Sequence, residues 1–271
     1  MLVRVPLATL WSDPDLNDTG HVDGDAVGRR RLSFPSDVVT QALLGDEAVV
    51  DEVRPDGWAR VRLPDQGDYP GWLPIAQLAD GSTVDGPVAT VDALATDLRD
   101  EPNGTLAMPG VPLGTRLVAA GPGRDGWLPV RVPGAAEPRW VAAADVRSDP
   151  ADPLATARRL LGVVYVWGGL SPGGIDCSGL VHLAWRRAGV RLPRDAHAQA
   201  AAAEPLAPGE ERAGDLYFFA QPGARVHHVG IVVNPGSMLH ACGDARIVVE
   251  EPLPPSRVAT LTGAARPRPV S

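Results

Sequence analysis

Lysine is absent from this 271-residue sequence, cysteine occurs twice, and long hydrophobic runs are missing. Arginine therefore carries every fixed positive side-chain charge, and the formal net charge is −8. That balance argues against nucleic acid, whose phosphates attract clustered basic residues. No run approaches the roughly 20 apolar residues needed to cross a bilayer. We expect neither a nucleic-acid partner nor a membrane partner.

The two cysteines, Cys177 and Cys242, are too few for a disulfide framework, which fits a reducing compartment. The opening "MLVRVPLATLWSDPD" lacks the longer apolar region and the small-residue cleavage site of a signal peptide. We therefore expect a cytoplasmic protein, or a secreted one if an export signal was removed.

A weak internal repeat organises the first half of the chain. "LLGDEAVVDEVRPDGWARVRLP" resembles "PLGTRLVAAGPGRDGWLPVRVP", with Gly45 answering Gly114 and Trp58 answering Trp127 at one offset (127 − 58 = 69). Short alternating runs bounded by Asp-Gly turns are typical of half-buried strands. The pattern resembles bacterial SH3-like domains and predicts two small β-barrels, at 1–80 and 85–147. We expect both tryptophans to be core residues.

A Pro- and Asp-rich joint, "RSDPADP", separates the repeats from a third domain at 150–271. Helical spacing comes first in this domain. Four strand-like runs follow, in "GDLYFFA", "HHVGIVV", "SMLHAC" and "RIVVEEPL". Helices followed by an antiparallel sheet predict an α+β fold.

Cys177 precedes the helical run "LVHLAWRRAG", which places it at or just inside a helix start. The unpaired N–H groups of such a start carry partial positive charge and favour thiolate over thiol. Asp176 or Ser178 could serve as the N-cap of the same helix. The position makes Cys177 a candidate nucleophile and leaves a small buried cysteine as the other reading.

A cysteine nucleophile needs a base, and the base needs an orienting partner. His228 opens an apolar strand on the same face as Gly230. If "NPG" is a three-residue hairpin loop, Val233 pairs with Ser237 and Gly230 with His240, so His228 and His240 become diagonal neighbours on one face. A four-residue loop would put the two rings on opposite faces. The six histidines are His21, His182, His197, His227, His228 and His240.

These motifs together resemble the NlpC/P60 family of papain-like cysteine peptidases. The resemblance rests on "YVWGGLSPGGIDCSGLVHLAWRRAGVRLPRDAHAQ", "GDLYFF", "HHVGIVV" and "MLHA", in that order. With two SH3-like repeats ahead, the arrangement resembles γ-D-glutamyl-diamino-acid endopeptidases, which cleave peptidoglycan stem peptides. It implies a peptidase without metal or other cofactor. Cys177 matches the nucleophile, His228 the base and His240 the orienting residue. Tyr165 matches a tyrosine beside the thiol.

The resemblance also implies substrate contacts. Asp176 and Ser178 match positions that hold the free amine of the L-Ala at the start of the stem peptide. Arg194 is expected to meet a substrate carboxylate or to lie on the surface. Ala196 replaces a serine found in many relatives, so one substrate hydrogen bond is expected to be missing.

In the same family the first SH3-like domain walls off one end of the groove. Tyr69 in "YPGWLP" resembles the aromatic residue of that wall. Its acidic partner does not map cleanly, and Gln41 and Asp46 are the candidates.

Three other interpretations remain open. The chain could be a cell-wall peptide-binding module with an inactive peptidase-like domain. Cys177, Cys242, His228 and His240 could instead form a metal site, although no C-x-x-C pair is present. Without a metal, Cys242 is most simply a small buried residue. The same fold could also act as an amidase or acyltransferase on another substrate, because fold does not determine function.

Overall fold

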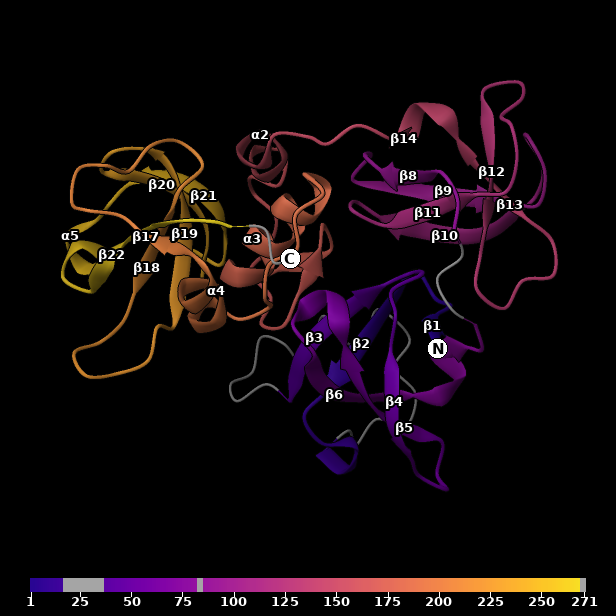
Figure 1. Ribbon diagram of the computed structural model, residues 1–271, viewed down its shortest axis with the longest axis horizontal. Helices are drawn as coiled ribbons and strands as arrows, with labels where there is room; N and C mark the ends of the chain where they lie inside the picture. Colours follow the sequence, from indigo (N-terminus) through magenta and orange to yellow (C-terminus); the bar gives the residue numbers. More distant parts are fainter. Residues whose placement is uncertain (17–36, 82–84, 269–271) are drawn as a thin grey trace. The chain divides into compact units, whose positions relative to one another are not determined.

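A computed structural model describes residues 1–16, 37–81 and 85–268 (Figure 1). The chain divides into two compact units, Met1–Pro150 and Ala151–Ser271. The described part of the first unit contains a five-stranded sheet, a seven-stranded sheet and a separate two-stranded pair, and the second unit combines helices with a six-stranded sheet. Within the described ranges, no helix has both the length and the apolar character needed to span a bilayer.

The first sheet region occupies the described residues up to Ala79. A five-stranded sheet has the order β3-β2-β6-β5-β4, and β1 pairs separately with β7. In β5 the alternation predicted from sequence is visible, because Ala59, Val61 and Leu63 are buried while Arg60 is exposed. The strands are β1 (Leu2–Val3), β2 (Leu7–Trp11), β3 (Val38–Leu43), β4 (Val49–Val53), β5 (Trp58–Leu63), β6 (Tyr69–Pro74) and β7 (Leu78–Ala79).

The second sheet region is one seven-stranded antiparallel sheet in the order β10-β9-β13-β12-β11-β8-β14. Its core is aliphatic and includes Val91, Leu98 and Leu117. The strands are β8 (Val88–Val91), β9 (Ala95–Arg99), β10 (Leu106–Pro112), β11 (Arg116–Ala119), β12 (Trp127–Arg131), β13 (Arg139–Ala142) and β14 (Val146–Arg147).

The internal repeat has a structural counterpart. Gly45 and Gly114 both adopt left-handed backbone angles, φ +82° and +83°, in the turns after β3 and β10. Trp58 and Trp127 each begin a strand, β5 and β12. Both are only half-buried, so the prediction that they are core residues was wrong for Trp127, whereas Trp58 packs against the buried Trp11 and Val38 at the edge of a core cluster. An indole ring at a strand start lies at the rim of a sheet, where part of it stays in contact with solvent.

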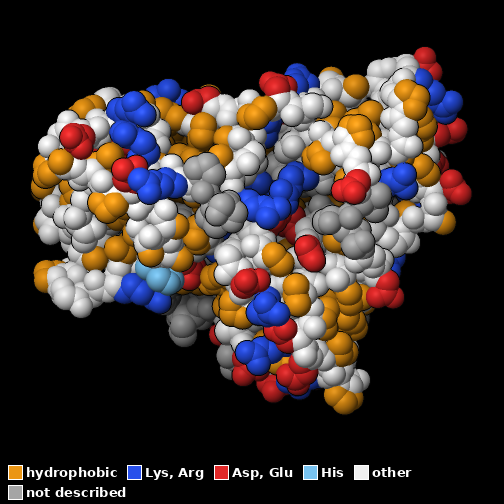
Figure 2. Space-filling view, in the orientation of Figure 1, with side chains coloured by type: hydrophobic (Ala, Val, Ile, Leu, Met, Phe, Trp, Pro, Cys, Tyr) orange, Lys and Arg blue, Asp and Glu red, His pale blue; other side chains and the backbone are white. Residues whose placement is uncertain are grey.

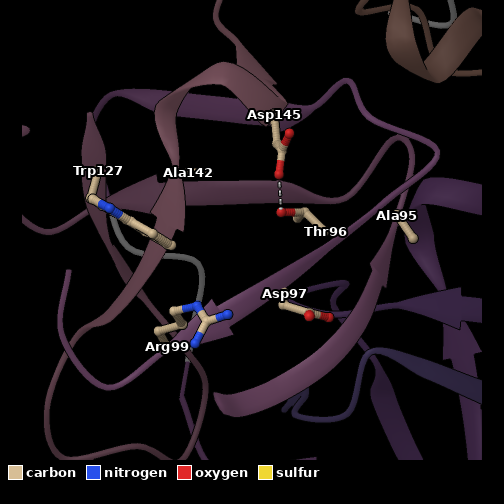
Figure 3. Close-up of a pocket in the computed structure, with 7 residues that line it drawn as sticks. All are labelled: Ala95, Thr96, Asp97, Arg99, Trp127, Ala142 and Asp145. Carbon is tan, nitrogen blue, oxygen red and sulfur yellow. Dashed lines mark hydrogen bonds between the residues drawn. The ribbon is translucent and has the colours of Figure 1, made fainter. Parts of the chain in front are cut away.

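Trp127 instead lines a pocket of about 320 Å³ on the second sheet (Figure 3). The guanidinium of Arg99 lies 5.9 Å from the centre of its ring. Across the pocket, the Thr96 hydroxyl donates a 2.6 Å hydrogen bond to Asp145. The pocket therefore combines an aromatic wall with groups of both charges.

Acidic and basic side chains are interspersed on the first sheet region in the face shown in Figure 2. Ion pairs in this region include Arg54 with Asp15 and Arg62 with Asp51. Such exposed pairs contribute little to stability, because solvent screens the attraction between the two charges.

In the second unit α2, α3 and α4 precede the main sheet, as the α+β prediction requires, whereas α5 lies between its last two strands, β21 and β22. The sheet is antiparallel with the order β17-β22-β18-β19-β20-β21 (Figure 1). Helix α3 packs against β19 and β20. The elements are α2 (Pro153–Arg158), β15 (Leu170–Ser171), β16 (Gly174–Ile175), α3 (Cys177–Arg187), α4 (Ala196–Ala202), β17 (Glu204–Pro205), β18 (Leu216–Phe219), β19 (His228–Asn234), β20 (Ser237–Cys242), β21 (Ile247–Pro252), α5 (Pro255–Val258) and β22 (Leu261–Arg266).

The four strands predicted from apolar runs are confirmed as β18 to β21. The sequence reading missed β22, which pairs with β18 and separates it from β17. Its residues "LTGAAR" are small and mixed in polarity, so neither alternation nor an apolar run marks them as a strand. This segment is therefore a strand because it pairs with β18.

Candidate active site

Helix α3 starts at Cys177, and Asp176 is its N-cap. The Gly179 amide donates a 2.7 Å hydrogen bond to Asp176 Oδ1, which satisfies one of the free donors of the first turn. A glycine is required at position 179 because a β-carbon there would collide with the carbonyl oxygen of Gly169. The local sequence therefore places the thiol at the first helical position, as predicted.

Asp176 also belongs to a buried ion pair. Arg194 Nη1 and Nη2 donate to Asp176 Oδ1 and Oδ2 at 2.9 and 2.7 Å, and the Gly168 amide donates to Oδ2 at 2.8 Å. Arg194 is 1% exposed, so the expectation of a surface role for this residue was wrong. A two-bond pair between planar groups fixes orientation as well as charge. The sequence reading missed this pairing because the two residues lie 18 positions apart.

Ser178 lies within the same network. Its hydroxyl accepts a 3.0 Å hydrogen bond from Arg194 Nη1 and lies 3.3 Å from Asp176 Oδ1, to which it donates. The Gln199 side-chain amide donates to the Ser178 carbonyl at 3.0 Å. The contacts of Asp176 and Ser178 with a substrate amine remain predictions, and the Asp176 carboxylate already accepts from donors within the chain.

His228 and His240 lie on one face of the sheet. His228 Nε2 and His240 Nδ1 are 2.8 Å apart, and the ring planes meet at 82°. The pairing of Ile231 with Leu239 continues by one pair to bring Gly230 opposite His240. The prediction that the two rings share a face is therefore confirmed.

The loop that produces this register differs from the predicted one. Asn234 pairs with Ser237, so only Pro235 and Gly236 connect the strands, and the predicted pairing of Val233 with Ser237 was wrong. A register shift between Val232 and Asn234 marks Val233 as an extra residue. This bulge restores the odd offset that a three-residue loop would have given.

The hydrogen-bonded chain continues beyond His240. His240 Nε2 lies 3.1 Å from Glu251 Oε1, on the neighbouring strand β21. A carboxylate accepts only, so this contact places a proton on Nε2 and leaves the Nδ1 lone pair facing His228. His228 then donates from Nε2 and keeps Nδ1 free to accept a proton. The sequence reading missed Glu251 because only the pairing of β20 with β21 brings it beside His240.

The sulfur of Cys177 lies at the start of β19. The backbone groups of Val229 and Ser178 lie within hydrogen-bonding reach of it. Val229 directly follows His228 in that strand. Helix α3 and strand β19 therefore bring the thiol beside the backbone of the residue that follows His228.

Burial of Cys177, which is 6% exposed, raises its pKa to about 12, and the negative charge of Asp176 adds to the rise. The Val229 and Ser178 backbone groups and the charge of Arg194 act in the opposite direction but do not outweigh burial. The expectation that the helix start would favour thiolate was therefore wrong for the free protein. Desolvation penalises the charged form more than the helix start favours it.

The two histidines are neutral for the same reason. Burial lowers the pKa of His228 well below 6.5, and the positive charge of Arg257 contributes. Burial also lowers the pKa of His240, although the hydrogen bond to Glu251 partly opposes this. Burial thus favours the neutral thiol of Cys177 and the neutral imidazoles of His228 and His240 in the free protein.

Tyr165 and Arg257 stand close to this group. Burial and the nearby Cys177 raise the pKa of Tyr165, so its phenol stays protonated and able to donate. Arg257 on α5 lies 5.7 Å from the centre of the Phe219 ring, and that ring centre is 5.6 Å from the His228 ring. Arg257 is a cation near the base that the sequence reading missed, since α5 has no motif of its own.

The remaining predicted residues lie elsewhere. Tyr69 is half-buried on β6 in the first unit and packs against that sheet's core. Gln41 and Asp46 are buried there, with the Asp46 carboxylate accepting from the Leu43 amide at 2.9 Å. A contact of Tyr69 with substrate stays a prediction. His21 lies outside the described residues.

The metal site considered from the sequence, with Cys177, Cys242, His228 and His240, is not the grouping that the structure shows. Among the residues described, His240, Cys242 and Glu251 have ligand atoms within 4.8 Å of one another. Cys242 is buried at the end of β20, as expected for a small core residue. This group includes His240 but neither His228 nor the nucleophile Cys177.

Known proteins are similar to this chain along nearly its whole length. The profile of the NlpC/P60 family matches residues 162–262, and that of the bacterial dipeptidyl-peptidase Sh3 domain matches residues 29–78. A Bacillus cereus protein named gamma-D-glutamyl-L-lysine dipeptidyl-peptidase is 31% identical, over 97% of this chain and 90% of that protein. The chain belongs to the NlpC/P60 family.

Two further comparisons agree with this membership. A crystal structure of an NlpC/P60 family protein from Bacillus cereus has a TM-score of 0.87 and 28% identity, with 98% of each chain covered. A Bacillus subtilis protein, also named gamma-D-glutamyl-L-lysine dipeptidyl-peptidase, is 41% identical over 33% of this chain and 31% of its own. This NlpC/P60 protein is a cysteine peptidase with an SH3 domain ahead of its catalytic domain.

Proposed function

We propose that this NlpC/P60 peptidase hydrolyses the γ-D-glutamyl–diamino acid bond of peptidoglycan stem peptides, and that it prefers L-Ala-γ-D-Glu-diamino acid with a free N-terminus. The observation that carries the proposal is the likeness to a gamma-D-glutamyl-L-lysine dipeptidyl-peptidase over 97% of the chain. That likeness includes the region before the catalytic domain. We further propose a cytoplasmic role in cell-wall recycling or turnover.

The geometry supports the following reaction. His228 Nδ1 takes the thiol proton of Cys177 as the sulfur attacks the γ-carbonyl carbon, and a tetrahedral oxyanion forms. Backbone N–H groups at the start of α3 and the Tyr165 hydroxyl, which lies close enough to Cys177 for its own pKa to be affected, are assigned as donors to this oxyanion. The imidazolium of His228 then protonates the leaving amine of the diamino acid as the C–N bond breaks, which leaves a thioester on Cys177.

Hydrolysis of the thioester reverses these roles. His228, neutral again, takes a proton from water, whose oxygen attacks the thioester carbonyl. The collapsing intermediate releases the glutamyl γ-carboxylic acid, and the proton returns to the Cys177 sulfur. His240 accepts from His228 Nε2 throughout, and Glu251 holds the proton on His240 Nε2. The chain of contacts keeps one tautomer for both steps.

Two charged groups match the proposed substrate. A γ-linked D-glutamate keeps a free α-carboxylate, and Arg257 is a cation whose charge acts on His228, His240 and Tyr165. At the other end, the free amine of L-Ala is assigned to the surroundings of Asp176 and Ser178. Arg194 is assigned to holding Asp176 rather than to a substrate carboxylate, because its guanidinium already makes two bonds to that residue.

The test offers L-Ala-γ-D-Glu-diamino acid with a free or an acetylated N-terminus to the wild type, Cys177→Ala, His228→Ala and His227→Ala. Cleavage of the free peptide is expected in the wild type and in His227→Ala, whose exposed ring directly precedes His228 in the chain. Both site variants are expected to lose it. Activity surviving in Cys177→Ala would refute the nucleophile, and equal cleavage of both peptides would refute recognition of the free amine.

A second pair of substrates tests the linkage. The same tripeptide with D-glutamate joined through its α-carboxyl places the free carboxylate on the other arm. We expect the γ-linked peptide to be cleaved and the α-linked peptide to be spared. Hydrolysis of both at similar rates would point to a broader amidase on this fold.

A further inference from the structure

Three possible metal ligands lie together on the side of His240 that faces away from His228. His240 Nε2, Cys242 Sγ and a Glu251 carboxylate oxygen all lie within 4.8 Å of one another. His240 and Cys242 are two residues apart on β20 and therefore lie on the same face, and Glu251 comes from the neighbouring strand β21. An imidazole, a thiol and a carboxylate form a donor set typical of zinc, which is bound by nitrogen, sulfur and oxygen ligands in tetrahedral sites.

The size of this group fits such an ion. Metal–ligand distances of about 2.0 to 2.3 Å place the ligand atoms of a tetrahedral zinc site about 3.3 to 3.7 Å apart. The present atoms, within 4.8 Å of one another, need to approach by about 1.5 Å at most. The Glu251 side chain, at 38% exposure, can make this adjustment and gives the ion a route from solvent. His240 and Cys242 are held by the strand, and solvent water can fill the fourth position.

We propose that His240, Cys242 and Glu251 form a zinc-binding site that reversibly inhibits the peptidase. Zn²⁺ binds the lone pair of His240 Nε2, the Cys242 sulfur as thiolate and a carboxylate oxygen of Glu251. One proton, that of the Cys242 thiol, is released to solvent. His240 stays neutral and carries its proton on Nδ1 instead of Nε2.

Inhibition follows from that change of tautomer. Catalysis needs His228 to hold protons on both ring nitrogens after attack, with Nε2–H donating to the lone pair on His240 Nδ1. In the zinc-bound state Nδ1 of His240 carries a proton and points it at His228 Nε2, which is only 2.8 Å away. Two N–H groups cannot face each other at that distance. The imidazolium of His228 is therefore disfavoured, and so is transfer of the thiol proton from Cys177.

Metal binding is tested without the catalytic thiol. Cys177→Ala protein, freed of metal with a chelator, is titrated with Zn²⁺ against a competing zinc dye. We expect one equivalent to bind, and binding by Cys177→Ala/Cys242→Ser to be at least about tenfold weaker, since loss of even an outer-shell partner weakens metal sites 10- to 100-fold. Titration with Co²⁺ is expected to show a thiolate-to-metal absorption band that depends on Cys242. This arm does not depend on the proposed substrate.

Inhibition is tested with the two intact catalytic histidines in place. Wild-type peptidase is expected to lose activity with added Zn²⁺ and to recover it with EDTA, whereas Cys242→Ser and Cys242→Ala need at least about tenfold more zinc. Each variant is compared with its own rate in chelator, and its unfolding temperature is measured to confirm that it folds. Equal zinc sensitivity in wild type and both Cys242 variants would overturn the proposal, since it would place the ion on Cys177 and His228. Failure of Cys177→Ala to bind zinc would overturn it as well.

Discussion

The buried pair between Arg194 and Asp176 gives the sharpest test of how this peptidase positions its nucleophile. Substitution of Arg194→Met keeps most of the side-chain volume and removes both bonds to the carboxylate, at 2.7 and 2.9 Å. The two side chains are 1% and 8% exposed, so the remaining charge has almost no access to water. Removing one partner of such a pair costs about 3 to 5 kcal/mol.

A matched control lies on the surface of the same unit. Arg158 also makes two bonds to a carboxylate, that of Glu250, but these side chains are 46% and 33% exposed. Arg158→Met is expected to cost less than about 1 kcal/mol. Both variants remove one arginine and break a two-bond contact with a carboxylate. They differ in burial and in the further bonds of Arg194 to the Ser178 hydroxyl and the Gly169 carbonyl.

The measurement is local, because a chain of two compact units need not unfold in one step. Hydrogen exchange of peptides from α3, followed by mass spectrometry across a urea series, reports the opening free energy of the helix that carries Cys177. We expect Arg194→Met to lower it several-fold more than Arg158→Met and to reduce kcat as the thiol loses its position. Equal losses in the two variants would refute the role of burial in this argument.

Three further predictions concern the catalytic chain. The plot of kcat/KM against pH is expected to stay level down to below pH 6.5. Burial lowers the pKa of the base His228, so its imidazole stays neutral at pH values where a free histidine would be protonated. A fall in kcat/KM at or above pH 6.5 would contradict this. Glu251→Gln removes a half-exposed carboxylate from His240 and is expected to lower kcat about fivefold, roughly 1 kcal/mol, in stopped assays with zinc-free buffer; no change would show that the carboxylate does not set the tautomer. Gly230→Ala places a β-carbon 2.6 Å from Met238 Sδ and 3.3 Å from His240 Cβ. We expect this crowding to cost about 1 to 3 kcal/mol of stability and to slow the reaction by displacing His240. A wild-type rate would mean that His240 is not displaced.

Several elements follow from local sequence. Asp176 and Gly179 specify the start of α3, since one caps the first turn and the other leaves space for the Gly169 carbonyl. Apolar runs predicted β18 to β21, and an odd hairpin offset predicted that His228 and His240 share a face. These features depend on residues a few positions apart along the chain, where capping and alternation act.

Other features depend on residues that are distant in sequence. Arg194 was predicted to lie on the surface or against substrate, but it is buried against Asp176, and a charged residue shows its burial only in the folded chain. The thiolate expected at the helix start is a neutral thiol, because packing removes water from Cys177 more completely than the helix start can offset. Glu251 and Arg257 lie near the histidines through strand pairing and through α5, which no motif marks.

Local sequence patterns specify the residue types of the reaction and their order: a cysteine at a helix start, a histidine near the start of a strand and a second histidine in the next strand. They also specify the repeat in the first half, since Gly45 and Gly114 adopt the same left-handed turn. The directions of the pKa shifts and the hydrogen bond between His240 and Glu251 arise only when the chain folds. The physical reason is that burial and cross-strand pairing set local electrostatics, and both depend on which distant segments pack together.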